Sequence, residues 1–378
     1  MILAGFLAAA TVVGLGQALA GQALLRRFLR GKPGRGMAAV SVLKPIAGDE
    51  PLLEAALETL FLQDHPAFQI VLGVQNPADP ALAVIERLRA RHPDRDVALV
   101  VNSARHGANG KVANLINMLP AAKHPILVVA DADVHAPPGW LADVVAALDK
   151  PGTGLVTALY TGLPATRGLV GALGAAAITH GFLPSALLSR ALGRQDCFGS
   201  TMALRRATLD AIGGFEALAD HLADDNLLGV LVKRQGLGIA LARSVVATTV
   251  TETRLGPLFR HELRWARTIR RLEPAGHAAS VLQFPLFWAG LATLADWHLA
   301  WLFAAAWAIR ALLARAAERR LAAPSTGRAW LPIWLWPLRD VLSVVVWGAS
   351  FLSDTVSWRG ALLRAAPVPT ETMGHQPR

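Results

Sequence analysis

The chain has 378 residues, of which 53% are hydrophobic and only 17% are charged, and its formal net charge is +10. This composition is too apolar for an ordinary soluble enzyme, and the single cysteine, Cys197, excludes an intrachain disulfide framework and a cysteine-based zinc site. The basic residues cluster beside hydrophobic segments, which favours an anionic lipid surface over nucleic acid as their partner.

Residues 1–26 are predicted to form an N-terminal transmembrane anchor. Residues 1–25 carry no charged side chain, and a helix of that length can cross a bilayer core of about 30 Å. A cleaved signal peptide is the alternative, but its positive charge would precede the apolar run. Here the charge follows it, at Arg26, Arg27, Arg30, Lys32 and Arg35. The positive-inside rule therefore places the next segment in the cytoplasm.

Residues 38–255 are predicted to form a separate cytoplasmic domain between the two apolar parts of the chain. Apolar runs of strand length alternate with helical patterns, which predicts a largely parallel α/β sheet. The runs are continuously apolar, as expected when both faces of a sheet are covered. The expected strands lie within 38–45, 68–75, 96–102 and 124–134, and the helices between them within 51–64, 80–92 and 111–122.

The last of these strands runs directly into two carboxylates, Asp131 and Asp133. Parallel α/β sheets bind their ligands at this end of the strands. Two carboxylates one residue apart suit Mg²⁺ or Mn²⁺ bound to a diphosphate, because hard cations prefer oxygen ligands. Pro137 and Pro138 then keep the strand from continuing. A solvated strand end is the alternative, since this short pattern often arises by chance.

A second pair of carboxylates, Asp224 and Asp225, follows the turn expected at Gly213 and Gly214. A carboxylate beside a bound electrophile can act as a general base. The alternative is that these residues cap a helix, where aspartate is also favoured.

Lys111 follows a glycine-rich turn, HGANG, that opens a helix. Backbone N–H groups at such a turn favour phosphate. The complete P-loop pattern is absent, because Arg105 stands where its first glycine would fall and Val112 replaces the serine or threonine. ATP hydrolysis is therefore discounted.

The segment HELRWARTIRR, residues 261–271, begins like a zinc-protease helix, but Trp265 replaces the second histidine and excludes that class. Arg264, Arg267 and Arg271 fall on one helical face. Residues 256–275 are therefore predicted to form an amphipathic helix at the membrane interface. Closure of Arg264 and Trp265 over a diphosphate is a second possible role, and the two roles are compatible.

Residues 277–355 are predicted to form transmembrane or re-entrant helices, followed by a tail at 356–378. Ten of the eleven tryptophans lie at or after position 265, and tryptophan prefers the bilayer interface. A loop at 315–328, which contains four arginines, is expected in the cytoplasm. The candidate spans are 279–296, 297–314 and 331–353.

Taken in order, six segments of this chain resemble the inverting glycosyltransferases with a GT-A fold, most closely ceramide glucosyltransferase and the bacterial hopanoid-associated glycosyltransferases. The resemblance covers about residues 38–272. It implies a Rossmann-like, nucleotide-sugar-binding α/β domain with a mixed, mainly parallel sheet flanked by transmembrane helices. The segments are SVLKPIAGDEP, VLGVQNPADPA, GANGKVANLINML, ADADV, GGFEALADHLADDN and HELRW.

The same resemblance implies the roles of the site residues. Asp225 is expected to be the general base, and Asp131 and Asp133 the ligands of Mg²⁺ or Mn²⁺. Two positions depart from the family pattern: His261 replaces glutamine or arginine, and Gly110 replaces the proline that often precedes the lysine. The residues expected to bind the nucleotide sugar are Pro45, Glu50, Asp79, Lys111, Asp131, Arg264 and Trp265.

The implied function is transfer of a sugar from a UDP-sugar donor to a hydroxyl of a membrane lipid, by an integral protein of the bacterial inner membrane. The sequences FGSTMALRR and HELRWARTIR resemble the hopanoid branch more closely, which implies UDP-N-acetylglucosamine as donor and bacteriohopanetetrol as acceptor. Ceramide glucosylation from UDP-glucose is the alternative. A polysaccharide synthase would need more spans than the three or four expected here, and a non-enzymatic scaffold would not explain the coincidence of motifs.

Overall fold

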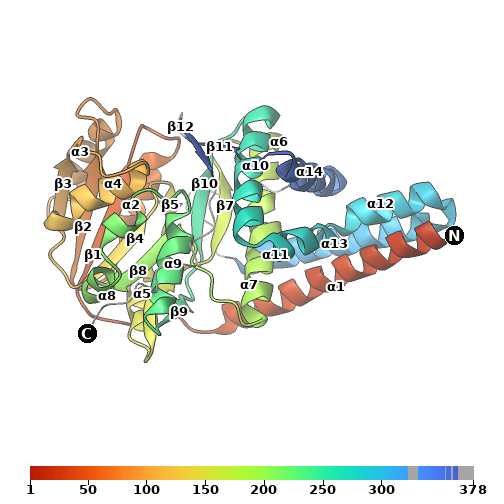
Figure 1. The fold of residues 1–378 in the computed structure, drawn as a ribbon, viewed down its shortest axis with the longest axis horizontal. Coiled ribbons are helices and arrows are strands. Elements are labelled where there is room, and N and C mark those ends of the chain that lie inside the picture. The colour runs from red at the N-terminus through yellow and green to blue at the C-terminus, as the bar shows by residue number, and fades with distance from the viewer. Residues whose placement is uncertain (322–330, 354, 359–360, 365–378) are drawn as a thin grey trace, which may run out of the picture.

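The computed structural model describes residues 1–321, 331–353, 355–358 and 361–364. An α/β unit occupies one end of the molecule, and long apolar helices extend from its other side (Figure 1). A layer of helices that runs across the ends of the long ones separates these two parts (Figure 1).

The α/β unit is built on a seven-stranded sheet with the order β3-β2-β1-β4-β8-β6-β9. Strand β8 pairs antiparallel with both of its neighbours, and the other pairs in this sheet are parallel. The mixed, mainly parallel sheet is thereby confirmed. The strands are β1 (Val40–Ile46), β2 (Phe68–Val74), β3 (Val97–Val101), β4 (Ile126–Ala130), β6 (Thr153–Thr157), β8 (Thr201–Arg205) and β9 (Gly238–Leu241).

Each face of this sheet is covered by helices, as the continuous apolar strands require. Along β4, Val128 packs with one core and its neighbours Leu127 and Val129 pack with the other. Each such fully buried side chain contributes about 1.5–3 kcal/mol. Helices α2 (Leu53–Phe61), α3 (Ala81–Arg91) and α5 (Trp140–Leu148) cover the first face, and α4 (Gly110–Met118), α8 (Arg206–Ala211) and α9 (Asp224–Arg234) cover the second.

A second, three-stranded sheet lies between the α/β unit and the helical layer (Figure 1). Its order is β5-β10-β7, with β5 (Val134–His135), β10 (Val246–Val250) and β7 (Tyr160–Pro164). Strand β5 begins one residue after Asp133, so this sheet joins the carboxyl end of β4 to the helices. A hairpin of β11 (Thr355–Trp358) and β12 (Ala361–Arg364) completes the described strands.

The helical layer contains α10 (Leu255–Leu272) and a continuous helical segment made of α6 (Leu169–Ala177), a π turn at Ile178–Phe182 and α7 (Leu183–Ala191). Helix α10 covers most of the segment 256–275, but it ends at Leu272, and Pro274 starts a separate helix, α11 (Pro274–Ala279). The segment Leu169–Ala191 is long and apolar enough to cross a membrane. The sequence analysis included it in the α/β domain and did not recognise it.

The apolar helices beyond this layer are α1 (Ile2–Arg30), α12 (Pro285–Ala295), α13 (Ala300–Arg320) and α14 (Trp336–Ala349). Across the described residues, four helical segments meet the length and hydropathy of a membrane span: Ile2–Arg30, Leu169–Ala191, Trp297–Arg320 and Ile333–Leu352. Short helical turns lie at Leu119–Ala121, Phe215–Leu218, Ser280–Gln283, Trp297–Leu299, Ile333–Leu335 and Ser350–Leu352.

Two of the expected spans differ from the prediction. The span expected at 279–296 is bent by 62° between Pro274–Gln283 and Pro285–Ala295, because proline cannot donate the backbone hydrogen bond that would continue the helix. The span expected to end at 314 continues to Arg320, so the start of the expected loop is helical. Arginines in the last turn of a helix complement its dipole, which favours this extension. Residues 322–328 of that loop lie outside the described residues.

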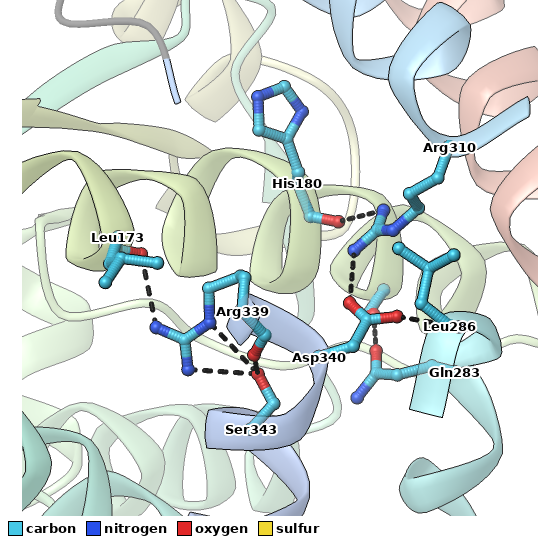
Figure 2. Close-up of polar contacts among 9 residues, drawn as sticks. Leu173, His180, Gln283, Leu286, Arg310, Arg339, Asp340 and Ser343 are labelled. Atoms are coloured by element: carbon cyan, nitrogen blue, oxygen red, sulfur yellow. Dashed lines mark hydrogen bonds and ion pairs between the residues drawn. The ribbon is translucent and has the colours of Figure 1, made fainter. Parts of the chain in front are cut away.

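A buried ionic network ties the helices together (Figure 2). The guanidinium of Arg310 in α13 lies 3.5 Å from a carboxylate oxygen of Asp340 in α14 and donates to the carbonyl of His180 at 3.4 Å. Asp340 also accepts a 3.1 Å hydrogen bond from the backbone N–H of Leu286, at the start of α12. Buried charges are tolerated only when they are paired, so this network fixes how α12, α13 and α14 meet the helical layer.

Candidate active site

Lys111 joins the two acidic segments that the sequence analysis had considered separately. Its Nζ lies 2.7 Å from Oδ1 of Asp131 and 3.4 Å from Oδ2 of Asp224. The carboxyl end of β4 supplies Asp131, and the first turn of α9 supplies Asp224. Asn109 caps α4, and its side-chain oxygen accepts hydrogen bonds from the backbone of Lys111 and Val112, which fixes the lysine at the mouth of the site.

Asp225, the residue expected to be the general base, is partly buried beside this cluster. Its Oδ1 accepts a 2.8 Å hydrogen bond from the backbone N–H of Asn226. A β-carbon at Gly199 would lie 3.0 Å from its Oδ2, so the glycine leaves room for the carboxylate. Desolvation, and then the charge of Asp224, raise the pKa of Asp225 to about 6, while Lys111 opposes the rise. The carboxylate is therefore able to accept a proton near neutral pH.

Asp133 faces the three-stranded sheet. The hydroxyl of Thr248 in β10 donates to its Oδ2, and its backbone carbonyl accepts a 3.2 Å hydrogen bond from the N–H of Thr249. Desolvation and the neighbouring charge of Asp131 raise the pKa of Asp133. Asp131 and Asp133 are thus held in place by different partners, one by Lys111 and the other by β10.

Lys44 is a charged residue of the site that the sequence analysis did not select. It is fully buried in β1, and its Nζ donates to the carbonyl of Val134 at 3.0 Å. Burial lowers the pKa of Lys44 to about 8, although Asp133 and Asp131 oppose this. A lysine within a buried strand needs a partner of opposite charge or a hydrogen-bond acceptor. The position of Lys44 within the apolar strand sequence SVLKP could therefore have indicated a buried polar site.

The carboxyl ends of β1 and β2 hold Pro45, Glu50 and Asp79. Pro45 lies in β1 opposite Gly73 of β2, and Glu50 precedes α2, where its carbonyl accepts a hydrogen bond from the N–H of Leu53. Both carboxylate oxygens of Asp79 accept from the backbone N–H of Gly48, at 3.1 and 2.9 Å. Asp79 therefore orders the loop between β1 and α2.

Trp265 packs into an apolar cluster on the helical layer with Ala175, Ile178 and Val250. The ring of His261 lies edge-on to it at 4.6 Å between centroids, and His261 Nδ1 pairs with the carboxylate of Glu252. At this position, where the family pattern has glutamine or arginine, the histidine supports Trp265. Burial raises the pKa of Glu252, but the hydrogen bond and charge of His261 and the charge of Arg264 together lower it below its ordinary value.

Tyr160, the single tyrosine of the chain, links the two parts of the site and was also missed. Its ring stacks on Phe182 at 4.3 Å between centroids and packs against the cluster that contains Trp265. Burial, followed by the charges of Asp225, Asp131 and Asp133, raises the pKa of its hydroxyl, which stays neutral. Tyr160 thus lies between the carboxylates and the helical layer.

The structure therefore brings Lys111, Asp131 and Asp225 into one acidic cluster with Asp224, and it places Asp133 at the edge of that cluster. Among the described residues, no three histidine, cysteine, aspartate or glutamate side chains are grouped so as to hold a metal by themselves. A cation at Asp131 and Asp133 would need further oxygen ligands from another molecule, which matches the way Mg²⁺ shares its ligands with phosphates.

The fold is that of the GT-A glycosyltransferases. The mannosyltransferase PcManGT from Pyrobaculum calidifontis, solved in complex with GDP-Man and Mn²⁺, superposes with a TM-score of 0.52 at 21% sequence identity, over 93% of this chain and 99% of that one. The family model described as "Glycosyl transferase family 21" matches residues 6–370. The chain belongs to this family.

Two curated relatives are named for the same activity. Ceramide glucosyltransferase 1 of Caenorhabditis elegans is 22% identical over 241 residues, which cover 62% of this chain and 51% of that protein. Ceramide glucosyltransferase of Komagataella phaffii is 33% identical over 115 residues, which cover 29% of this chain and 23% of that protein. The chain thus spans about half of the first relative's length and less than a quarter of the second's.

Proposed function

We propose that this chain is a membrane-bound inverting glycosyltransferase that moves a sugar from a UDP-sugar to a hydroxyl of a membrane lipid. The observation that carries the proposal is the meeting of Lys111, Asp131 and Asp225 at the carboxyl edge of a GT-A sheet, beside the helical layer and the apolar helices. Ligands of α/β sheets bind at this edge, and the helices supply the route by which a lipid reaches it.

The donor is proposed to bind with its diphosphate against Asp131, Asp133 and Lys111. The two carboxylates would hold Mg²⁺ or Mn²⁺ through their oxygen atoms. Such a cation, when bound, withdraws negative charge from the leaving UDP. Asp79 orders the loop that contains Glu50 and follows Pro45, and this loop borders the nucleotide.

Asp225 takes the proton of the acceptor hydroxyl as the hydroxyl oxygen bonds to the anomeric carbon. The bond between that carbon and the diphosphate oxygen breaks in the same displacement, and UDP leaves with the electron pair. Attack from the face opposite the leaving group inverts the configuration, so an α-linked donor gives a β-glycoside. Lys111 and Arg264 offset the charge that develops on the diphosphate.

The acceptor is proposed to enter between the carboxylates and the wall formed by Tyr160 and Trp265. The names of the curated relatives support ceramide as an acceptor and glucose as the transferred sugar, and UDP-glucose is the donor that we propose with them. The hopanoid pair, bacteriohopanetetrol with UDP-N-acetylglucosamine, stays a prediction from the resemblance of sequence motifs. The arginines at the C-terminal end of α1 support an orientation in which the α/β unit faces the cytoplasm, where nucleotide sugars are made.

The purified full chain in nanodiscs tests this proposal. Each of the two UDP-sugars is combined with each of the two lipids, UDP release is followed, and the lipid product is identified by mass spectrometry. The proposal requires UDP release that depends on one lipid and a β-glycoside of that lipid as product. UDP release that is independent of added lipid, or no release in any combination, would overturn it.

A further inference from the structure

A groove of about 580 Å³ lies between α1 and α13, away from the carboxylates of β4 and α9. The two helices pack side by side (Figure 1). Residues of α1 at spacings of three and four place one helical face against the groove. It is lined by Leu19, Gln22, Ala23, Arg26, Arg27 and Arg30 of α1 and by Leu313, Ala316 and Arg320 of α13.

The groove is apolar along one part and strongly basic along the other. Leu19, Leu313 and Ala316 form its apolar wall. Four arginines line its basic end, no carboxylate lines it, and within the described ranges Arg26, Arg27 and Arg30 take part in no ion pair. Like charges one helical turn apart repel each other, so a bound anion would stabilise the basic end by reducing this repulsion.

Gln22 provides a second, independent sign of a ligand. Its Nε2 atom is buried and has no hydrogen-bond partner among the residues that the structure describes. A buried amide donor without an acceptor is destabilising. Gln22 lines the groove one turn before Arg26. Because its Nε2 atom is closed to solvent, the side chain would rotate to donate to an acceptor oxygen bound beside the arginines.

The groove also lies where the apolar helix surface meets the first charges. Residues 2–25 of α1 are uncharged, and Arg26 begins the basic segment. This is the position of lipid headgroups relative to a membrane helix. An apolar wall joined to a basic end matches an acyl chain joined to a phosphate, whereas a soluble phosphate would leave the apolar wall unused.

We propose that this groove is a binding site for an anionic phospholipid, with the headgroup phosphate at Gln22 and the arginines and an acyl chain along Leu19 and Leu313. The site is distinct from the glycosyl-transfer site and does not depend on the proposed function. The bound lipid stabilises the packing of the membrane helices, because it contacts both α1 and α13.

Native mass spectrometry of the full chain in detergent tests the proposal. Phosphatidylglycerol and phosphatidylcholine with identical acyl chains are titrated, and the dissociation constant of the first bound lipid is measured. The groove variant is Arg26→Gln with Arg30→Gln. The matched control is Lys32→Gln with Arg35→Gln, which removes the same charge from exposed residues outside the groove.

The groove variant is expected to weaken phosphatidylglycerol binding about 25-fold, since each arginine near an anionic phosphate is worth about fivefold. The control is expected to change it less than about twofold, and phosphatidylcholine binding is expected to stay weak in every variant. Gln22→Leu keeps the net charge and is expected to weaken phosphatidylglycerol binding about fivefold.

Three outcomes would overturn the proposal. Equal losses in the groove and control variants would mean that the arginines act only through net positive charge. An unchanged affinity in Gln22→Leu, together with normal retention on gel filtration, would remove the specific contact. Displacement of the lipid by millimolar inorganic phosphate would assign the groove to a soluble anion.

Discussion

Lys111 lies 2.7 Å from Asp131 and 3.4 Å from Asp224, so one ammonium group connects the end of β4 to the start of α9. These segments are 93 residues apart in the chain. The lysine compensates the mutual repulsion of the carboxylates, and it also lowers the pKa of Asp225, which burial and Asp224 raise. Lys111 therefore determines both the arrangement of the carboxylates in the acidic cluster and the pKa of Asp225.

Replacing Lys111 by methionine should shift the acidic limb of the kcat/KM profile to higher pH. The shift follows because the cation that opposes the rise in the pKa of Asp225 is removed. The KM for the UDP-sugar should also increase, since a positive charge facing the diphosphate is lost. Steady-state kinetics from pH 5 to pH 9 measure both effects. Lys111→Arg, which keeps the charge, should restore the limb, and an unchanged profile in Lys111→Met would contradict this role.

Asp225→Asn should reduce kcat by about 10²–10⁴-fold, the usual loss when a general base is removed. The substitution keeps the shape of the side chain, so UDP-sugar binding measured by calorimetry should be retained. Asp149→Asn is the control, because Asp149 is an exposed carboxylate that pairs with Arg205. Turnover near that of the wild type in purified Asp225→Asn would rule out this residue as the base.

The raised pKa of Asp225 also predicts a pH-dependent stability difference that needs no substrate. The folded-state pKa of about 6 lies above the ordinary value of 3.8, so ionisation costs free energy in the folded state. This cost is absent below about pH 4, grows between the two values, and is complete above about pH 6. Asp225→Asn removes it. Melting measured in EDTA should therefore show a higher Tm for the variant at pH 8 and nearly equal values at pH 4. A difference that did not change with pH would refute the assignment of this pKa.

Much of the fold follows from sequence pattern alone. The strands at Val40–Ile46, Phe68–Val74 and Ile126–Ala130 were predicted because their apolar runs must be buried on both faces of a sheet. The segment Leu169–Ala191 was missed because its apolar run was assigned to the core of the α/β domain. More than half of its most apolar window is buried inside the protein, so hydrophobicity alone does not distinguish it from a core helix.

The members of the candidate site could be selected by residue type, but their contacts could not be predicted. Asp131, Lys111 and Asp225 were selected from local motifs, whereas the pairing of Lys111 with both acidic segments depends on how α4 and α9 pack on the sheet. Tyr160 gave no signal, because Phe182 and the apolar cluster against which it packs are distant in the sequence and no spacing rule connects them. Roles that arise from long-range packing need the tertiary structure.

Removal of divalent cations should abolish sugar transfer, and Mg²⁺ or Mn²⁺ should restore it. Asp133→Asn should raise the Mn²⁺ concentration needed for half-maximal activity, because a carboxylate ligand becomes a weaker neutral one. Thr248→Val is the matched control, since it removes the hydroxyl that donates to Asp133 but leaves the carboxylate. The metal role would be wrong if UDP-sugar binding were insensitive to both EDTA and Asp133→Asn.

The ion pair between Glu262 and Arg339 should be the strongest single link between α10 and α14. The two terminal guanidinium nitrogens of Arg339 each lie 2.7 Å from a carboxylate oxygen of Glu262, and the side chain of Arg339 is only 2% exposed. Arg339 also donates to the carbonyl of Leu173 in α6 at 3.2 Å (Figure 2). The pair therefore holds the helix of Arg264 against both neighbours.

Breaking one side of this pair leaves a buried charge without compensation, which costs about 3–5 kcal/mol. Arg339→Met and Glu262→Gln should each lower the Tm in detergent by several degrees, and the double variant should lose less than the sum of the two. The control is Arg89→Ala, which breaks the exposed pair with Glu86 and should cost less than about 1 kcal/mol. Because Glu262 lies two residues before Arg264, the single variants should also raise the KM for the UDP-sugar more than they lower kcat. Additive losses in the double variant would show that the two residues act independently and that α10 is held by other contacts.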